Sequence, residues 1–282
     1  MKDTTIRQSF LGERSDEILD GSVVGAVGLG GAGSHIVQQL SHVGVGTLIL
    51  VDPDRAELSN LNRLVGATRR DGEAARLKTR IAQRVAKSVN PHVRLRLHST
   101  PWNEAMDDLR DADIIVGCID SYSERAQLEA FARRFLIPYL DIGMDVHEIG
   151  DHHVVAGQVA LSMPGDVCLF CMAVITESDL AKEAARYGAA GGRPQVVWPN
   201  GLLASAAVGL LVELLTPWFP SHVMSTLLRY DGNNQSLGVD NWFKLQDQRR
   251  CKHYPLADVG DPHPFWHPSG EALRSRRPRR IG

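Results

Sequence analysis

The chain has 282 residues, of which 43% are hydrophobic and 23% are charged. This length and composition allow a full hydrophobic core and exclude a largely disordered protein. The formal net charge of -2 gives no reason to expect nucleic acid or a membrane surface as the main partner.

The N-terminus has scattered charges and no secretory signal pattern, so we expect a cytoplasmic protein. The most apolar window, residues 201–215, is shorter than the roughly 20 residues that span a bilayer, so we expect a buried helix.

Strands and helices alternate in the predicted order up to about residue 145. After a short helical segment in residues 1–20, we expect strands at 23–27, 47–51, 93–98, 113–119 and 139–142, with helices at 73–88 and 123–135. Such alternation is typical of an α/β protein with a Rossmann-like, doubly wound and mainly parallel sheet.

From about residue 157 the pattern changes to a strand at 158–163, a Pro-Gly turn, a cysteine pair and a loop-rich segment at 184–200. We interpret this part as an appended C-terminal lobe of one domain. The expected organisation is a domain over 21–255, with a nucleotide-binding part at 21–150, a substrate and zinc lobe at 151–255, and a tail at 256–282. Five arginines between 274 and 280 give the tail a basic end, which fits either an acidic partner or a solvated terminus.

A glycine-rich turn follows the first predicted strand directly. Residues 28–33 read G-x-G-x-x-G and lead into a helix, where backbone N–H groups can meet phosphate oxygens. The glycines of this motif are Gly28, Gly30 and Gly33. Asp52 ends the next strand, where a carboxylate can accept hydrogen bonds from ribose hydroxyls. These features predict a nucleotide but do not separate NAD from ATP.

The segment at 52–63 distinguishes the two nucleotides. It places carboxylates, amides and Arg63 within a short stretch, and Lys78 follows on a helix. The pyrophosphate of a nicotinamide cofactor is already held by a glycine-rich turn, whereas the outer phosphates of a triphosphate need cations. This pattern favours ATP.

Three motifs resemble the family of ThiF, MoeB, HesA and the ubiquitin-activating enzymes. Residues 51–63 resemble V-D-x-D-x-x-x-x-S-N-L-N-R, residues 118–125 resemble C-T-D-N-x-x-x-R, and Arg7-Gln8 resembles the R-Q of the family. The resemblance covers roughly residues 5–255. It implies an ATP-dependent adenylyltransferase that forms an acyl-adenylate on a carboxylate and releases pyrophosphate.

The resemblance also implies roles for individual residues. The three glycines shape the phosphate turn, Asp52 holds the ribose, and Asp120 places Mg²⁺. The phosphates would be held by Asn60, Arg63 and Lys78, while Arg7 would reach the site of a neighbouring subunit in a homodimer. Asp54 is either a ligand to the site or a turn residue, and Arg125 either orients Asp120 or lies on a helix surface.

A cysteine pair predicts structural zinc. Cys168 and Cys171 follow a Pro-Gly turn much as the first zinc pair of the family does, but a second pair is missing. Cys251 and His253 could complete a Cys₃His site, which zinc accepts in tetrahedral geometry. The alternative is that the cysteines are free thiols.

Residues 172–250 contain no cysteine, so we expect no enzyme thioester at the usual crossover position. The glycine-rich loop at 184–200 is either a mobile cover or a loop without function. The expected substrate is the C-terminal glycine of a ubiquitin-like protein or a peptide. Other hypotheses are adenylation of a small molecule or tRNA base, an NAD(P)-dependent oxidoreductase, and a non-catalytic scaffold subunit.

Overall fold

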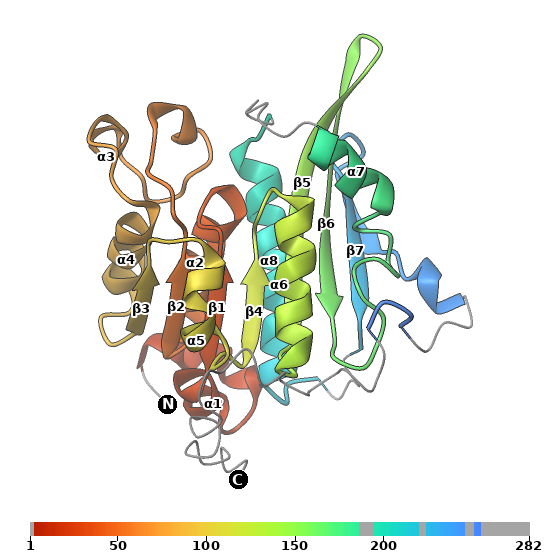
Figure 1. Ribbon diagram of the computed structural model, residues 1–282. Helices are drawn as coiled ribbons and strands as arrows, with labels where there is room; N and C mark the ends of the chain where they lie inside the picture. Colours follow the sequence, from red (N-terminus) through yellow and green to blue (C-terminus); the bar gives the residue numbers. More distant parts are fainter. Residues whose placement is uncertain (1–2, 186–193, 220–223, 246–250, 255–282) are drawn as a thin grey trace.

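The computed structural model describes residues 3–185, 194–219, 224–245 and 251–254. These residues form one sheet of eight strands in the order β3-β2-β1-β4-β5-β6-β7-β8, with helices on both faces (Figure 1). The predicted tail at 256–282, with its basic end, and residues 186–193 of the predicted cover at 184–200 lie outside the described residues. The predicted Rossmann-like α/β fold with a doubly wound, mainly parallel sheet is confirmed, with four parallel and three antiparallel strand pairs.

The first five strands of the chain run parallel to one another. They are β1 (Val23–Val27), β2 (Thr47–Val51), β3 (Arg94–His98), β4 (Ile114–Gly117) and β5 (Tyr139–Ile149). β1, β2 and β4 are buried along their whole length, which explains why their sequences are continuous apolar runs. The carboxyl ends of all five strands therefore meet at one edge of the sheet.

The later strands continue the same sheet in antiparallel fashion. β6 (His152–Ser162) pairs with β5, and β7 (Thr226–Asp231) and β8 (Ser236–Val239) follow. β5 and β6 form a long hairpin that projects beyond the carboxyl edge of the parallel strands (Figure 1). The sequence predicted only residues 139–142 and 158–163 as strands, because the outer half of the hairpin is exposed and polar.

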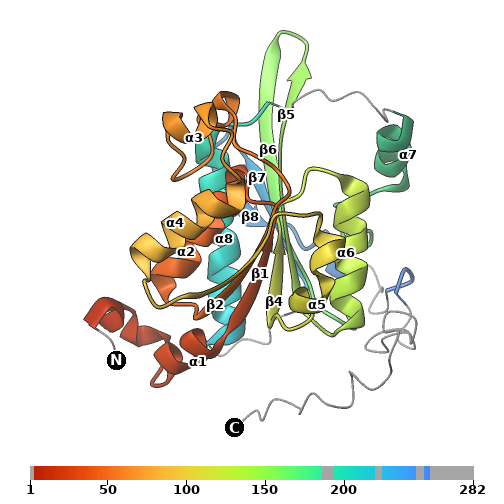
Figure 2. The same ribbon diagram turned by 60° about the vertical axis from the view of Figure 1, so that its left-hand side comes forward.

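Helices form a layer on each face of the sheet (Figure 2). One layer holds α2 (Gly31–Val43), α4 (Lys78–Val89) and α8 (Val197–Leu215); the other holds α5 (Met106–Leu109), α6 (Tyr122–Arg134) and α7 (Glu177–Ala185). Each layer covers its own apolar core. Shorter elements are η1 (Asp3–Leu11), α1 (Ser15–Gly21), η2 (Leu58–Asn60), α3 (Arg69–Glu73), η3 (Trp102–Ala105) and η4 (Trp242–Leu245).

The helix predicted at 73–88 is interrupted near its start. α3 ends at Glu73, Ala75 has a φ of 46°, and α4 begins only at Lys78. The backbone N–H of Arg76 donates to the carbonyl of Asp71, and the N–H of Ala56 donates to the carbonyl of Arg76. Pairing with the segment that follows β2 therefore replaces helical hydrogen bonds here, and it sets Lys78 at the start of a helix.

The apolar helix α8 begins four residues before the predicted window and has 19 residues. By length and composition alone it could cross a membrane. In the fold it packs against α2, β5 and β6, with Leu203, Ala207 and Leu211 fully buried. This packing agrees with the prediction of a core helix.

Candidate active site

A cavity of about 420 Å³ opens at the carboxyl edge of the parallel strands. Its walls include the ends of β1 and β2, the segment after β3, the segment after β4, and the start of α8. The edge of an open parallel sheet is where α/β proteins bind ligands, because the loops there diverge to either face. Of the predicted nucleotide residues, seven line this cavity: Gly28, Gly30, Asp52, Asp54, Arg63, Lys78 and Asp120.

Two glycines of the turn are required by its geometry. Gly28 has a φ of 85°, and a Cβ there would collide with the backbone carbonyl of Cys118. A Cβ on Gly33 would collide with the carbonyl of Gly28, whereas Gly30 has open space on that side. The turn therefore lies against the segment after β4, and the first N–H groups of α2 lack acceptors within the helix. An anion can be held there.

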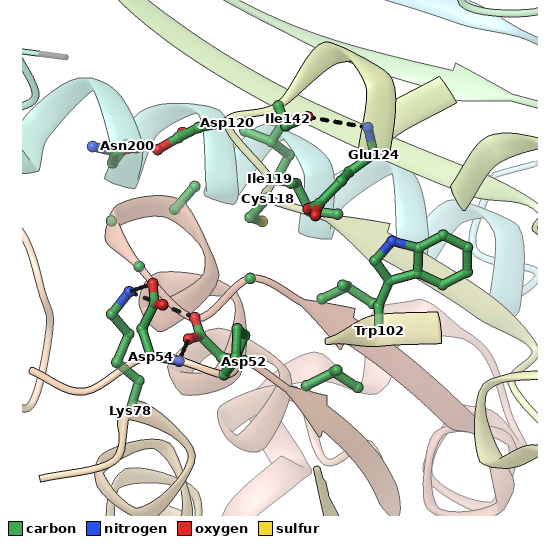
Figure 3. A pocket seen from close by; sticks show the side chains of 18 of the residues that line it. Asp52, Asp54, Lys78, Trp102, Cys118, Ile119, Asp120, Glu124, Ile142 and Asn200 are labelled. Carbon is green, nitrogen blue, oxygen red and sulfur yellow. Dashed lines mark hydrogen bonds and ion pairs between the residues drawn. The ribbon is translucent and has the colours of Figure 1, made fainter. Parts of the chain in front are cut away.

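Asp52 is almost fully buried and fixes the floor of the cavity. Its carboxylate accepts hydrogen bonds from the backbone N–H of Leu29 at 2.6 Å and of Asp54 at 2.8 Å. Burial raises the pKa of Asp52, and the positive charge of Lys78 opposes that rise. The Lys78 Nζ lies 2.7 Å from Asp54 Oδ2 and 3.8 Å from Asp52 Oδ2 (Figure 3). Asp54 is thus more than a turn residue, since it orients the lysine.

Arg63 lies on the cavity wall without a carboxylate among its described partners. Its guanidinium donates to the carbonyl of Ser59 and to Asn62 Oδ1, both at 3.0 Å. Because these acceptors are neutral, the positive charge of Arg63 remains available to an anion. Asn60 does not line the cavity; its Oδ1 accepts from the N–H of Glu57 and shapes the turn that carries Arg63.

Asp120 follows β4 and is contacted by the segment that leads into α8. Gln195 Nε2 lies 3.2 Å from Asp120 Oδ1, and the carbonyl of Gln195 accepts from Asn62 at 2.9 Å. Glu183 of α7 accepts hydrogen bonds from the N–H groups of Tyr122 and Ser123 at the start of α6. Gln195 and Glu183 therefore contact Asp120 and the residues that directly follow it.

Arg125 is buried and forms an ion pair with Asp141, and it does not lie on a helix surface. The pair anchors the first turn of α6 to β5 and so fixes the segment that carries Asp120. Cys118 lines the same cavity, and burial, with the nearby charges of Asp141 and Asp120, raises the pKa of its thiol. A thiol with a raised pKa is a poor nucleophile at neutral pH.

The four predicted metal ligands come together. The Sγ atoms of Cys168 and Cys171 are 3.7 Å apart, as are those of Cys171 and Cys251, and His253 Nδ1 lies 3.4 Å from both Cys168 and Cys171. A tetrahedral zinc ion with these ligands would separate its ligand atoms by roughly 3.5–3.8 Å. The cluster therefore fits zinc, and its ligand atoms all lie within 4.8 Å of one another.

Arg7 lies on η1, which precedes β1 at the end of the sheet away from the cavity, and its side chain is exposed (Figure 1). It does not line the cavity of its own chain. The predicted role of Arg7 therefore does not involve the cavity of its own chain.

The cavity residues that sequence reasoning missed include Trp102, Glu124, Gln195 and Asn200. Trp102 lies in the segment after β3, at the first position of η3, so the rule that ligands bind beyond the carboxyl ends of strands was a usable signal for it. Glu124 sits between two motif residues on α6, but nothing in its spacing separates it from a surface glutamate. Gln195 and Asn200 reach the cavity only through the tertiary packing of α8.

Comparison with known proteins places these features in a family. A model of the ThiF family matches residues 3–253. Ubiquitin-like modifier-activating enzyme 5 of Drosophila virilis is 28% identical over 164 residues, which cover 53% of this chain and 39% of the relative. The corresponding enzyme of Gallus gallus is 25% identical over the same shares. The chain thus spans less than half the length of these curated relatives.

Solved structures show the same fold. The structure of E. coli MccB with ATP has a TM-score of 0.69 and 17% identity, covering 85% of this chain and 71% of MccB. MccB with MccA-N7isoASN gives a TM-score of 0.70 and 19% identity, with 84% and 71% covered. Because the family match extends over nearly all of the sequence, this chain belongs to the ThiF family.

Proposed function

We propose that this protein is an ATP- and Mg²⁺-dependent adenylyltransferase that forms an acyl-adenylate on the C-terminal carboxylate of a ubiquitin-like protein or a peptide. One observation carries the proposal: a single cavity gathers the glycine-rich turn, Arg63, Lys78 and Asp120. The relatives named as ubiquitin-like modifier-activating enzymes, and MccB crystallised with ATP and with MccA, support a carboxylate of this class.

The charges in the cavity support the need for a divalent cation. Its lining contains four carboxylates, on Asp52, Asp54, Asp120 and Glu124, against the two cations Arg63 and Lys78. A triphosphate entering such a site meets net repulsion unless further positive charge accompanies it. Asp120, with its oxygens on the cavity wall, would hold Mg²⁺, which would neutralise charge on the phosphates.

The reaction needs positioning and charge neutralisation more than acid–base catalysis. A carboxylate oxygen of the substrate attacks the α-phosphorus, a P–O bond forms, and the bond to pyrophosphate breaks. The attacking carboxylate is already ionised at neutral pH, so no proton has to move. Arg63 and Lys78 would stabilise the charge that collects on the leaving pyrophosphate.

The adenylate would pass to an external nucleophile. Cys168, Cys171 and Cys251 belong to the Cys₃His cluster, and the partly buried Cys118 has a raised pKa. The sequence contains no other cysteine. We therefore expect no enzyme-linked thioester, and mass spectrometry after incubation with ATP and substrate should detect adenylate without a substrate–enzyme adduct.

A homodimer is part of the proposal, because Arg7 could serve only the site of a second copy. Ile6 and Phe10 of the same helix are exposed, and Phe10 packs edge-on against the exposed Trp218. Clustered apolar side chains of this kind commonly mark subunit contacts. Light scattering of the purified protein should show the mass of two chains, and Phe10→Asp should lower it.

Calorimetry separates the proposed function from its main alternative. ATP should bind in the presence of Mg²⁺ and lose most of its affinity when Mg²⁺ is chelated, whereas an NAD(P)-dependent oxidoreductase would bind NAD without a divalent ion. Binding of NAD with indifference to ATP would contradict the proposal.

Asp120→Ala should reduce ATP–pyrophosphate exchange with the true substrate by about 10²–10³-fold, since it removes a fixed charge at the reacting phosphates. Glu17→Gln, at an exposed position on α1, serves as the control and should leave exchange unchanged. If Asp120→Ala catalyses ATP–pyrophosphate exchange at the rate of the control, Asp120 does not have the proposed role at the reacting phosphates.

A further inference from the structure

Glu124 is a carboxylate that the proposed chemistry leaves without a role. It lines the cavity from the first turn of α6, whose start is fixed by Ser121 Oγ accepting from the N–H of Glu124 at 3.2 Å. No described residue donates a hydrogen bond to its carboxylate, and the side chain is exposed to the cavity. An acidic group held in a ligand cavity without a donor suggests that a donor arrives with the ligand.

The position of Glu124 relates it to one end of the cavity. Figure 3 shows Trp102 and Glu124 on one side of Asp52, and Lys78 and Asp54 on the other. If phosphates lie between the glycine-rich turn and Lys78, with the ribose at Asp52, the base extends toward Trp102. This direction is set by the glycine-rich turn and does not depend on the choice of base.

The end of the cavity where the nucleotide base would lie is a slot with a rigid wall. Trp102 is almost fully buried and packs against Phe131, with ring centroids 5.9 Å apart, so its indole cannot easily swing away. Pro101 and Ile119 add apolar surface to the same cavity. A flat aromatic base can stack in such a slot, while a polar group at its margin reads the edge of the base.

The arrangement of the carboxylates in the cavity favours a neutral donor over a second metal ion as the partner of Glu124. Partial burial and the negative charges of Glu183 and Asp54 raise the pKa of Glu124. Asp120, proposed above to hold Mg²⁺, is contacted by Gln195, and its carboxylate lies apart from that of Glu124 in Figure 3. A neutral N–H donor at the edge of a base satisfies the carboxylate without requiring a second metal ion.

We propose that Glu124 selects adenine, its carboxylate accepting a hydrogen bond from the exocyclic amino group of the base. This inference rests on the proposed function, since it assumes a purine nucleotide in the cavity. Adenine presents an N–H₂ donor at position 6, whereas guanine and hypoxanthine present a carbonyl oxygen there. A carboxylate facing that oxygen places two acceptors together, so 6-oxo purines are rejected.

The test compares the binding of Mg-ATP and of Mg-inosine triphosphate by calorimetry, because the two nucleotides differ at the 6-position of the base. The wild-type protein should bind the inosine nucleotide about 10- to 100-fold more weakly than ATP. In Glu124→Gln the amide can rotate to donate to the 6-oxo group, so the preference should fall below about 3-fold. Glu17→Gln should keep the wild-type preference.

Three results would overturn the inference. Equal binding of both nucleotides by the wild-type protein excludes base selection, and a preference that survives in Glu124→Gln assigns it to another group. A loss of affinity in Glu124→Gln that is equal for both nucleotides, and that added Mg²⁺ repairs, makes Glu124 a metal ligand. If the wild-type protein binds neither nucleotide, the proposed function itself is contradicted. That result is distinguishable from the three above, because in each of those the wild-type protein binds at least one nucleotide.

Discussion

The two halves of the sheet are held together in different ways. In the parallel half, β1, β2 and β4 are buried on both faces, and apolar side chains from α2 and α6 cover them. In the antiparallel half, hydrogen bonds and the Cys₃His cluster hold the loop after β6. Arg133 of α6 donates to the carbonyls of Asp166 and Val167, and Cys168 is the first residue of the cluster.

This difference implies that the interactions that stabilise the parallel half are not the ones that hold the antiparallel half in place. In the parallel half, apolar packing on both faces holds the strands, and charged residues gather at the carboxyl edge. The antiparallel half also contributes to both apolar cores, but it adds specific polar partners: a buried ion pair, a Cys₃His cluster and Tyr254 stacked on Arg133. Perturbations of those partners should therefore affect one half much more than the other.

Removal of zinc should have the largest effect. Structural zinc sites in small domains contribute about 10 kcal/mol or more, and part of that should appear here as a fall in Tm of about 10 °C or more after chelation. Hydrogen exchange should rise in residues 166–175 and 251–254, while β1 and β2 stay protected. Purified protein should contain about one zinc per chain, a content that Cys171→Ser abolishes and Cys118→Ala leaves intact.

Two results would show that the cluster does not hold the antiparallel half. One is carefully purified protein that carries no zinc; the other is hydrogen exchange that rises equally in both halves after chelation.

The buried pair of Glu129 and Arg133 should give the next largest effect. Arg133→Met should lower the free energy of unfolding by about 3–5 kcal/mol, because it leaves the fully buried Glu129 without its cation. The double variant Glu129→Gln/Arg133→Met should recover part of this loss, since Gln still accepts from the N–H of Leu169. Denaturant unfolding of both variants checks this, and strictly additive losses would exclude the coupling.

Much of the parallel half could be predicted from the sequence. The strands at 23–27 and 47–51 were predicted with their observed bounds, because each is a continuous apolar run that ends at a glycine or an aspartate. The glycine-rich turn and the charged motifs then supplied seven of the residues that line the cavity. All of these signals are local, and local patterns can be read without knowing which segments meet.

The remaining features depend on tertiary contacts. The break after Glu73 arises from backbone pairing with the segment that follows β2, and no proline marks it. The outer hairpin of β5 and β6 lacks the buried alternation that identifies strands. Trp102, Glu124 and Gln195 reach the cavity from three different segments, so only the fold brings them together.

A smaller effect is expected at Asp71, which ties together the loop around α3 in the parallel half. Its buried carboxylate contacts Arg84 at 2.6 Å and Arg76 at 2.8 Å, and the hydrogen bond from Arg84 holds its pKa well below the usual range. Asp71→Asn should cost about 1–2 kcal/mol at neutral pH, since both arginines are nearly half exposed to solvent.

The pH dependence of this effect has a definite sign. A lowered pKa in the folded state contributes stability above the ordinary aspartate pKa of about 4, and that contribution is lost as the pH falls toward the folded value. The difference in Tm between wild type and Asp71→Asn should therefore be constant from pH 5 to 8 and shrink below about pH 4. A difference that grows on acidification would contradict the assignment.

A crystal structure with Mg²⁺ and a non-hydrolysable ATP analogue tests the central claim most directly. We expect the phosphates at the glycine-rich turn beside Arg63 and Lys78, a magnesium ion on Asp120, and the base against Trp102. A cavity that excludes the triphosphate, or that binds it with its phosphates away from these cations, would contradict the assignment of this site to adenylation.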